Sequence, residues 1–139
     1  TCAIPILSVI AYEDIGLANP GIGPRLDAAI NASERVGLPE ARIPLGEIVI
    51  EMALSPKSNS SIMAIDQALN DIHKGSTGNV PNHIKTNSND YIYPHNYPND
   101  WVKQKYLPDN LANVRYYIPK NNLIEKNLNK VYKEMKGEK

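Results

Sequence analysis

A chain of 139 residues suggests a single domain, and its 42% apolar residues are enough for a hydrophobic core and exclude a disordered chain. The formal net charge is zero, which excludes the strong global charge of a dedicated nucleic-acid-binding protein. The charge is uneven, however, because residues 1–75 carry a net charge of −4 and residues 76–139 a net charge of +4. This asymmetry permits a basic contact surface in the C-terminal part.

The first twelve residues indicate whether the chain contains a disulfide, a membrane span or a natural N-terminus. Cys2 is the only cysteine, so no internal disulfide can form, and a buried, inert thiol is expected because no histidine lies nearby in the sequence. The apolar run over residues 3–12 is too short to span a bilayer, so no membrane contact is expected. The chain starts with Thr-Cys-Ala and is apolar at once, which predicts a fragment of a longer protein.

Up to Gly75, apolar residues recur at helical spacing. A first helix is predicted around residues 6–12, with Gly16 as its stop. A second is predicted over residues 24–36, because proline suits the first turn and Gly37 follows the last one. The apolar face of this second helix is predicted to consist of Leu26, Ala29, Ile30 and Ser33.

A third helix is predicted to open at Pro39, with Pro44 near its first turn as a possible bend. It is strongly apolar, which predicts that it is the central buried helix. Its apolar residues are Ile43, Ile48, Val49, Met52 and Ala53. A last amphipathic helix is predicted over residues 121–136.

The stretch LSPKSNSS, residues 54–61, contains Pro-Lys-Ser where a phosphate-binding loop has Gly-Lys-Ser. Such a loop needs glycines and a preceding strand, and this stretch has neither. Ser55 as N-cap and Pro56 at the first helical position instead predict the start of a helix that continues to Gly75. A weak anion site at this helix start, assisted by Lys57, remains an alternative.

Residues 76–119 have a different character, with five prolines and seven of the nine aromatic residues of the chain. Prolines at this density break regular structure, so the segment is expected to be extended and to pack on the helices through its aromatic rings. Trp101 is the expected anchor, and Tyr106 is expected to support it. Because Lys103, Lys105 and Arg115 are interleaved with tyrosines, stacking on nucleic-acid bases is a second, less favoured interpretation.

Residues with potential catalytic chemistry give weak patterns. Glu13 and Asp14 are adjacent, and adjacent residues on a helix point about 100° apart, which disfavours a shared acid–base pair. The three histidines at positions 73, 83 and 95 lack the spacing of metal ligands. Neither group predicts an active site.

Six stretches in collinear order carry a specific resemblance. They are AYEDIGLANP, GLPEARIPL, ALSPKSNSS, VPNHI, YPHNYPNDWVKQKYLPDNL and YYIP. Together they resemble the C-terminal part of the RarA/MgsA replication-associated recombination proteins, AAA+ ATPases related to the Werner-helicase-interacting protein. The resemblance covers about residues 6 to 119.

The resemblance implies an all-α domain similar to the collar of clamp loaders, spanning residues 1–139. Its parts are a helical core over 1–75, an aromatic segment over 76–119 and a terminal helix over 120–139. It implies a non-catalytic role in gathering subunits into a tetramer, with the ATP- and magnesium-binding ATPase module upstream and no cofactor in this part. It further implies a bacterial, cytoplasmic, nucleoid-associated protein that acts on DNA at stalled replication forks with single-strand-binding protein as a partner.

One stretch departs from the family pattern. The family usually has a longer segment containing Gly and Lys where only TNSNDYI stands here, so either this member is shortened or residues are missing between Lys85 and Tyr93. Three interpretations follow, in order of preference: an oligomerisation domain, a DNA-contacting module and a free-standing enzyme. The residues considered for DNA contact are Lys57, Lys103, Lys105 and Arg115.

Overall fold

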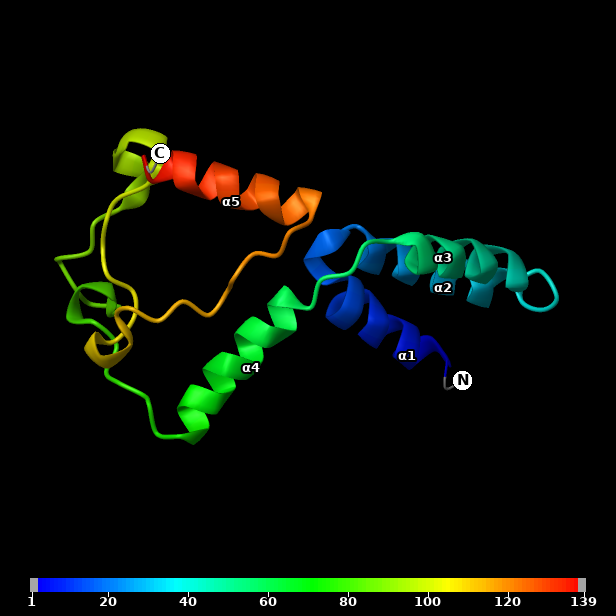
Figure 1. Cartoon of the computed structure of the whole chain (residues 1–139), viewed down its shortest axis with the longest axis horizontal. Coiled ribbons are helices and arrows are strands. Elements are labelled where there is room, and N and C mark those ends of the chain that lie inside the picture. Colours follow the sequence, from blue (N-terminus) through cyan, green and yellow to red (C-terminus); the bar gives the residue numbers. More distant parts are fainter. Residues whose placement is uncertain (1–2, 138–139) are drawn as a thin grey trace. The chain divides into compact units, whose positions relative to one another are not determined.

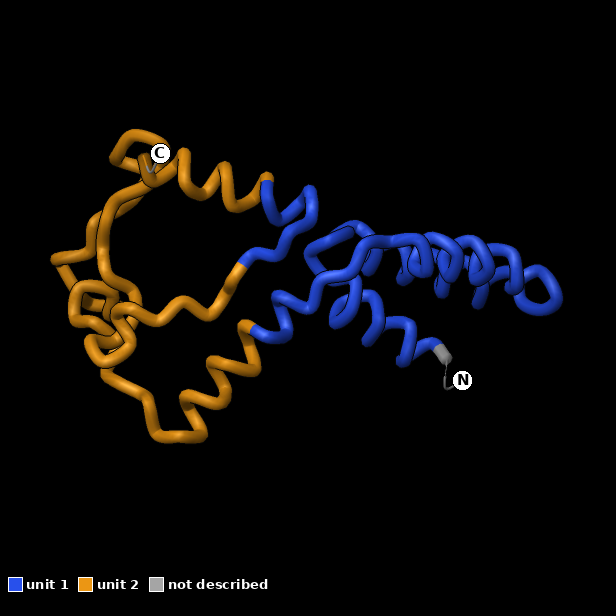
Figure 2. The backbone as a smooth tube through the Cα atoms, viewed as in Figure 1, with its two compact units in different colours: residues 1–63, 119–126 blue, residues 64–118, 127–139 orange. Residues whose placement is uncertain are grey.

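The computed structural model describes residues 3–137, and within this range it contains helices and turns but no strand (Figure 1). This confirms the predicted all-α class. The chain divides into two compact units (Figure 2), which we call unit 1 (residues 1–63 and 119–126) and unit 2 (residues 64–118 and 127–139). Helix α4 (Ser60–His73) and helix α5 (Leu123–Met135) each begin in unit 1 and continue into unit 2.

Unit 1 starts with helix α1 (Ala3–Ile10), which continues into the π-helical turn η1 (Ala11–Ile15) and the 3-10 turn η2 (Gly16–Ala18). Gly16 has a positive φ of 46°, and a Cβ atom on it would lie 2.5 Å from the carbonyl oxygen of Ser58. Only glycine fits this conformation and this close approach. The predicted stop at Gly16 is therefore confirmed, with a tertiary contact as an additional cause.

Helices α2 (Ile22–Val36) and α3 (Arg42–Leu54) lie side by side in unit 1 (Figure 1). Gly37 ends α2 with a φ of 69°, and its N–H donates to the carbonyl of Ser33 at 3.0 Å. The predicted inner face of α2 is confirmed, because Leu26 and Ser33 are buried and two further residues pack against the core. The buried core consists of Ala11, Ile15, Ile22, Leu26, Ile48 and Met52.

Helix α3 is not the central buried helix that its composition predicts. Ile48 and Met52 are buried, but Ile43, Ile50 and Leu54 are 59%, 61% and 81% exposed. The buried side of α3 packs in a core formed with α2, η1 and α1, and the other side of this almost uniformly apolar helix remains exposed. The prediction is wrong for the single chain because burial depends on what packs against a helix, and composition does not show this.

The predicted helix start at Ser55 and Pro56 is also wrong, since α4 begins at Ser60. Ser55 instead follows the last residue of α3, and its hydroxyl donates to the carbonyl of Glu51 at 2.8 Å. The Lys57 ammonium donates to the carbonyls of Met52 at 2.9 Å and of Ser55 at 2.6 Å. These residues therefore satisfy the C-terminal carbonyls of α3, which attract a cation.

In unit 2, the segment between α4 and α5 is irregular, as predicted. It contains four 3-10 turns, η3 (Asn82–Ile84), η4 (Pro94–Asn96), η5 (Pro98–Asp100) and η6 (Asp109–Leu111). Two of the turns open with proline, which suits a first helical position. Helix α5 confirms the predicted last helix. In the described part of the chain, no helix is long and apolar enough to cross a membrane.

Candidate interaction surface

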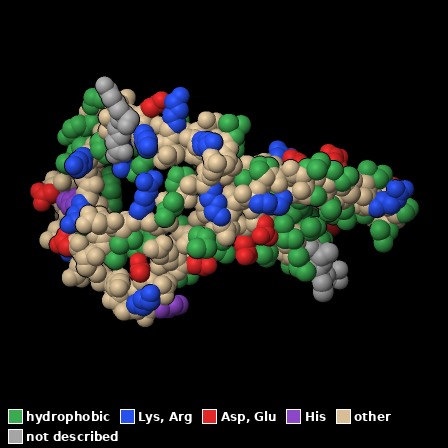
Figure 3. Space-filling model, in the orientation of Figure 1, with side chains coloured by type: hydrophobic (Ala, Val, Ile, Leu, Met, Phe, Trp, Pro, Cys, Tyr) green, Lys and Arg blue, Asp and Glu red, His purple; other side chains and the backbone are tan. Residues whose placement is uncertain are grey.

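Unit 1 exposes apolar helix faces. On α3, Ile43, Glu47, Ile50 and Leu54 share one face at helical spacing, and all four side chains are exposed; we call them the α3 stripe. On α1, Ile6 and Val9 are 58% and 55% exposed. Apolar atoms occupy much of the face of α1 and α3 in the view of Figure 3.

Unit 2 is more open still, since none of its described residues is buried. On α4, Ile65, Leu69 and Ile72 recur at helical spacing and are 55%, 44% and 55% exposed. On α5, Leu128 and Val131 are 48% and 62% exposed. Large exposed apolar patches mark interaction surfaces, so both units present candidates for contact with another protein surface.

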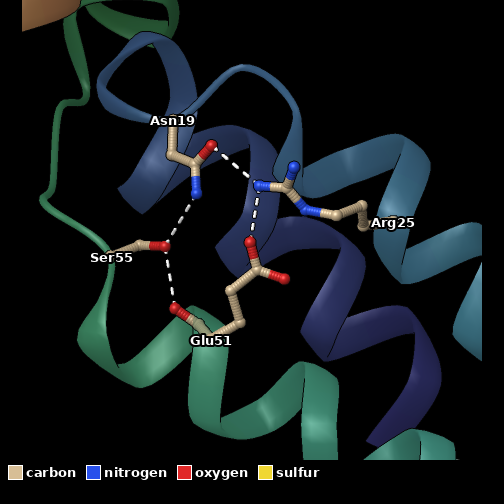
Figure 4. Close-up of polar contacts among 4 residues, drawn as sticks. All are labelled: Asn19, Arg25, Glu51 and Ser55. Carbon is tan, nitrogen blue, oxygen red and sulfur yellow. Dashed lines mark hydrogen bonds and ion pairs between the residues drawn. The ribbon is translucent and has the colours of Figure 1, made fainter.

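A polar network ties α2 to the end of α3 (Figure 4). Arg25 on α2 forms an ion pair with Glu51 on α3 at 2.5 Å and donates a hydrogen bond to the side chain of Asn19 at 3.1 Å. Asn19 in turn donates to the Ser55 hydroxyl at 3.0 Å. Ser55 was predicted to cap the start of α4, and it instead binds at the end of α3.

A groove of about 270 Å³ runs beside this network between α2 and α3. It is lined by Arg25, Ala28, Ala29, Pro44, Glu47, Ile48 and Glu51. Since Glu47 belongs to the α3 stripe, the groove borders the exposed apolar face of unit 1 and gives it a concave edge. Four of the seven lining residues are apolar, while Arg25 and the two glutamates supply the charge.

The residues predicted to contact DNA are divided between the two units. Lys57 lies in unit 1 and is bound to the carbonyls at the end of α3, whereas the helix whose start it was predicted to assist begins only at Ser60. The other three lie in unit 2. Of these, Lys103 is exposed, and the Arg115 Nε donates to the carbonyl of Tyr117 at 3.2 Å.

Lys105 is engaged within unit 2. Its ammonium forms an ion pair with the carboxylate of Asp109, and its carbonyl oxygen lies 2.6 Å from Nε2 of His83. The hydrogen bond from Lys105 and its positive charge lower the pKa of Asp109. The carboxylate of Asp109 thus compensates the charge of Lys105 within the chain itself.

The aromatic segment touches the helical parts of unit 2 through individual contacts of Trp101 and Tyr116. Trp101 is half-buried, and the Lys136 ammonium of the segment after α5 lies 5.8 Å from its ring centroid and 4.3 Å from that of Tyr132. The Tyr116 hydroxyl donates to the carboxylate of Asp71 on α4 at 3.1 Å. Tyr106 is 52% exposed and accepts a hydrogen bond from the side chain of a neighbouring glutamine.

The environment of Tyr116 perturbs its titration. Partial desolvation raises the pKa of its hydroxyl, and the hydrogen bond to Asp71 and the charge of that carboxylate raise it further. The neutral phenol is therefore the favoured form in the folded chain. This contact fixes the end of the aromatic segment to α4.

The acidic residues and histidines considered for catalysis lie on η1, at the end of α4 and in the turns η3 and η4. Glu13 and Asp14 are both exposed on η1. Nδ1 of His95 lies 3.2 Å from Asp100, and no group of three metal-ligating residues occurs in residues 3–137. Cys2 lies outside the described residues.

Glu125 on α5 is a charged residue that the sequence did not single out, and it is fully buried in unit 1. Its carboxylate accepts hydrogen bonds from the hydroxyls of Ser58 at 2.6 Å and Ser60 at 2.5 Å. The local signal was the capping pattern Asn122-x-x-Glu125, which predicts a helix start. Nothing local indicated partners more than 60 residues away.

The helical chain falls in the class of AAA+ ATPase C-terminal regions, because the family described as MgsA AAA+ ATPase C terminal matches residues 6–136. The chain belongs to this family. The resemblance found in the sequence is thereby confirmed.

The relatives are replication-associated and AAA proteins. A "Replication-associated recombination protein A" of Bacillus subtilis is 55% identical over 140 residues, covering 93% of this chain and 33% of that protein. The protein of the same name in Escherichia coli K12 is 30% identical, covering 84% of this chain and 28% of its own length. An uncharacterized AAA domain-containing protein of Mycobacterium tuberculosis is 37% identical, with 81% and 27% covered. The chain thus spans about a third of the length of these relatives, or less.

Proposed function

We propose that this chain is the oligomerisation domain of a RarA-like AAA+ ATPase that acts in replication-fork rescue, recombination and repair. The single observation that carries the proposal is the exposure of apolar stripes on α3, α4 and α5 together with the lack of buried residues in the described part of unit 2. Apolar helix faces of this extent are stable in water when another surface covers them. A second copy of the domain provides such a surface, and a collar-like tetramer is the assembly we expect.

The extent of the exposed apolar faces favours an obligate interface over a transient one. Obligate interfaces usually bury more than roughly 2,000 Å² and are apolar at their centre. The stripes supply the apolar centre, and the charged residues around them supply the polar rim. Ile50 and Leu54 are 61% and 81% exposed in the single chain, so an interface could bury most of the surface of each residue.

In this proposal the domain is not an enzyme, and ATP and Mg²⁺ bind to the ATPase module upstream. A phosphate loop requires glycines whose N–H groups surround the phosphates. The stretch around Lys57 has no such glycine, and its ammonium is bound to carbonyls of α3. We therefore expect no saturable ATP binding by this chain that depends on Lys57.

Multi-angle light scattering over a hundredfold dilution tests the proposal. The expected result is a mass of four chains without ATP or DNA, with dissociation only at the lowest concentrations. A mass equal to the 15.4 kDa chain at high micromolar concentration contradicts the proposal. Far-UV circular dichroism of the same sample confirms that the helices are folded.

A DNA-contacting role is the second candidate. The observation that favours it is the net charge of +4 over residues 76–139, with Lys103 and Arg115 exposed in unit 2. Phosphate contacts make affinity fall with increasing salt. Binding to forked or single-stranded DNA that weakens with salt and on substitution of Lys103 and Arg115 by Ala supports this role. Single-strand-binding protein and a location near the bacterial nucleoid are the corresponding expectations for the whole protein.

A further inference from the structure

Glu125 forms the centre of a buried polar cluster that neither proposed role uses. It is 0% exposed, and its two carboxylate oxygens accept separate hydrogen bonds, from Ser58 at 2.6 Å and from Ser60 at 2.5 Å. The side-chain amide of Asn122 donates to the same carboxylate. All four residues belong to unit 1. A buried carboxylate is tolerated only with this kind of compensation.

The cluster joins the beginnings of two helices. Asn122 caps α5, because its side-chain oxygen accepts the backbone N–H of Glu125 at 2.9 Å. In the usual capping box the glutamate turns back to the N-cap residue. Here its carboxylate also reaches Ser60, the first residue of α4, whose first turn contains no acidic residue. Glu125 thus supplies the negative charge that favours the N-terminal end of α4.

The serine loop is fixed from its other side as well. The backbone N–H of Ser58 donates to the carbonyl of Asp14 at 2.7 Å, and Gly16 approaches the Ser58 carbonyl too closely for any side chain. The loop is therefore anchored on the core side of unit 1. Residues 119–126, which we call the strap, attach to this anchored loop through Glu125 and through a hydrogen bond from Lys120 to Asn59.

None of the apolar residues of the strap is buried. Glu125 is its only buried residue, and Leu123 is 73% exposed. The core of unit 1, by contrast, is made of apolar side chains from α1, α2, α3 and η1. Loss of the Glu125 contacts should therefore affect the strap much more than the core.

We propose that Glu125 is a clasp, a positioning residue that closes the strap onto the Ser58–Ser60 loop and allows the strap to open as a unit while the core stays folded. Since α4 and α5 both begin at the clasp and both continue into unit 2, closing it fixes the starting points of the two helices together. The proposal does not depend on oligomerisation.

Amide hydrogen exchange followed by NMR on the full chain tests the clasp, with Glu125→Ala as the variant. The reporter of the strap is the amide of Lys126, which donates to the Asn122 carbonyl at 3.0 Å, and the amide of Ser58, which donates to the Asp14 carbonyl at 2.7 Å, reports the anchored loop. We expect the Lys126 amide to exchange roughly tenfold to a hundredfold faster, as loss of charge-assisted hydrogen bonds predicts. The amides of Ser58, α2 and α3 should change by less than about threefold, because the loop is anchored on the core and the core opens separately.

Glu134→Ala is the matched control, since Glu134 is an exposed glutamate on the same helix that lies 3.8 Å from Lys130. It should leave the exchange at both reporters unchanged. The double variant Ser58→Ala/Ser60→Ala removes the two donors and keeps the carboxylate, and it should reproduce the effect of Glu125→Ala. It also decides the question if Glu125→Ala does not fold.

Two results overturn the proposal. One is unchanged exchange at Lys126 in a folded Glu125→Ala or double-serine variant. The other is equal acceleration in α2, α3 and the strap, because Glu125 would then support the whole unit and not a separate strap.

Discussion

Replacing Ile50 and Leu54 by serine is the most direct test of the proposed subunit interface. Both side chains lie on the α3 stripe and are 61% and 81% exposed in the single chain. Serine at these positions removes apolar area without disturbing Ile48 or Met52, which form the buried side of α3. The double variant should therefore weaken association and leave the subunit folded.

The expected magnitude follows from the exposed fractions. Full burial of an Ile or Leu side chain contributes about 1.5–3 kcal/mol. Scaled by exposures of 61% and 81%, the two side chains together have roughly 2–4 kcal/mol left to gain in an interface. Since every 1.4 kcal/mol is a factor of ten, the dissociation constant should rise about thirtyfold to a thousandfold.

Sedimentation equilibrium over a dilution series measures this shift, and urea unfolding of dissociated subunits measures subunit stability. The unfolding free energy of the dissociated subunit should change by about 0.5 kcal/mol or less, as is usual for exposed positions. Leu38→Ser is the matched control, because Leu38 is 87% exposed but lies outside the stripe. An unchanged dissociation constant in the folded double variant would refute the assignment of the α3 stripe to the interface.

Three further outcomes follow from the contacts. Leu26→Ala should lower the unfolding free energy by about 2–5 kcal/mol in urea titrations, because Leu26 is fully buried, and a loss below about 1 kcal/mol would contradict the core assignment. Ser55→Ala removes one hydrogen-bond donor and one acceptor and should cost about 1–2 kcal/mol in the same assay, so an unchanged midpoint counts against the network in Figure 4. Tyr116 should titrate above its ordinary pKa of 10.0 when followed by phenolate absorbance, and Asp71→Asn should lower that pKa; an unmoved midpoint would exclude the contact. Because the folded pKa of Tyr116 is raised, its contribution to stability is present below pH 10 and is lost as the pH rises through the folded value.

Local sequence signals determined most of the helices. The spacing of apolar residues predicted α2 and its inner face, and Gly37 marked its end, because only glycine takes a φ of 69° at little cost. The prolines of residues 76–119 predicted irregular structure for the same kind of local reason: proline lacks an N–H and fixes φ. Six stretches in order were enough to identify the family.

The sequence pattern gave a wrong helix boundary where the same residues are typical both of a helix start and of a helix end. Ser55 and Pro56 are as suitable before a helix as after one. The sequence therefore predicted the start of α4 there, whereas Ser55 and Lys57 bind the last carbonyls of α3. The choice depends on Asn19, which reaches Ser55 from 36 residues away.

Burial and buried charge were decided only by the tertiary structure. The apolar composition of α3 predicted burial, but burial is a property of the surface that covers a helix, and within the chain only one side of α3 is covered. The sequence predicted no role for Glu125, yet it is fully buried because Ser58 and Ser60 supply its hydrogen bonds from another part of the chain. The sequence by itself determined which segments are helical and which family the chain resembles, because these follow from neighbouring residues. The tertiary structure decided which helix faces stay exposed and which charge is buried, because these depend on contacts between residues far apart in the sequence.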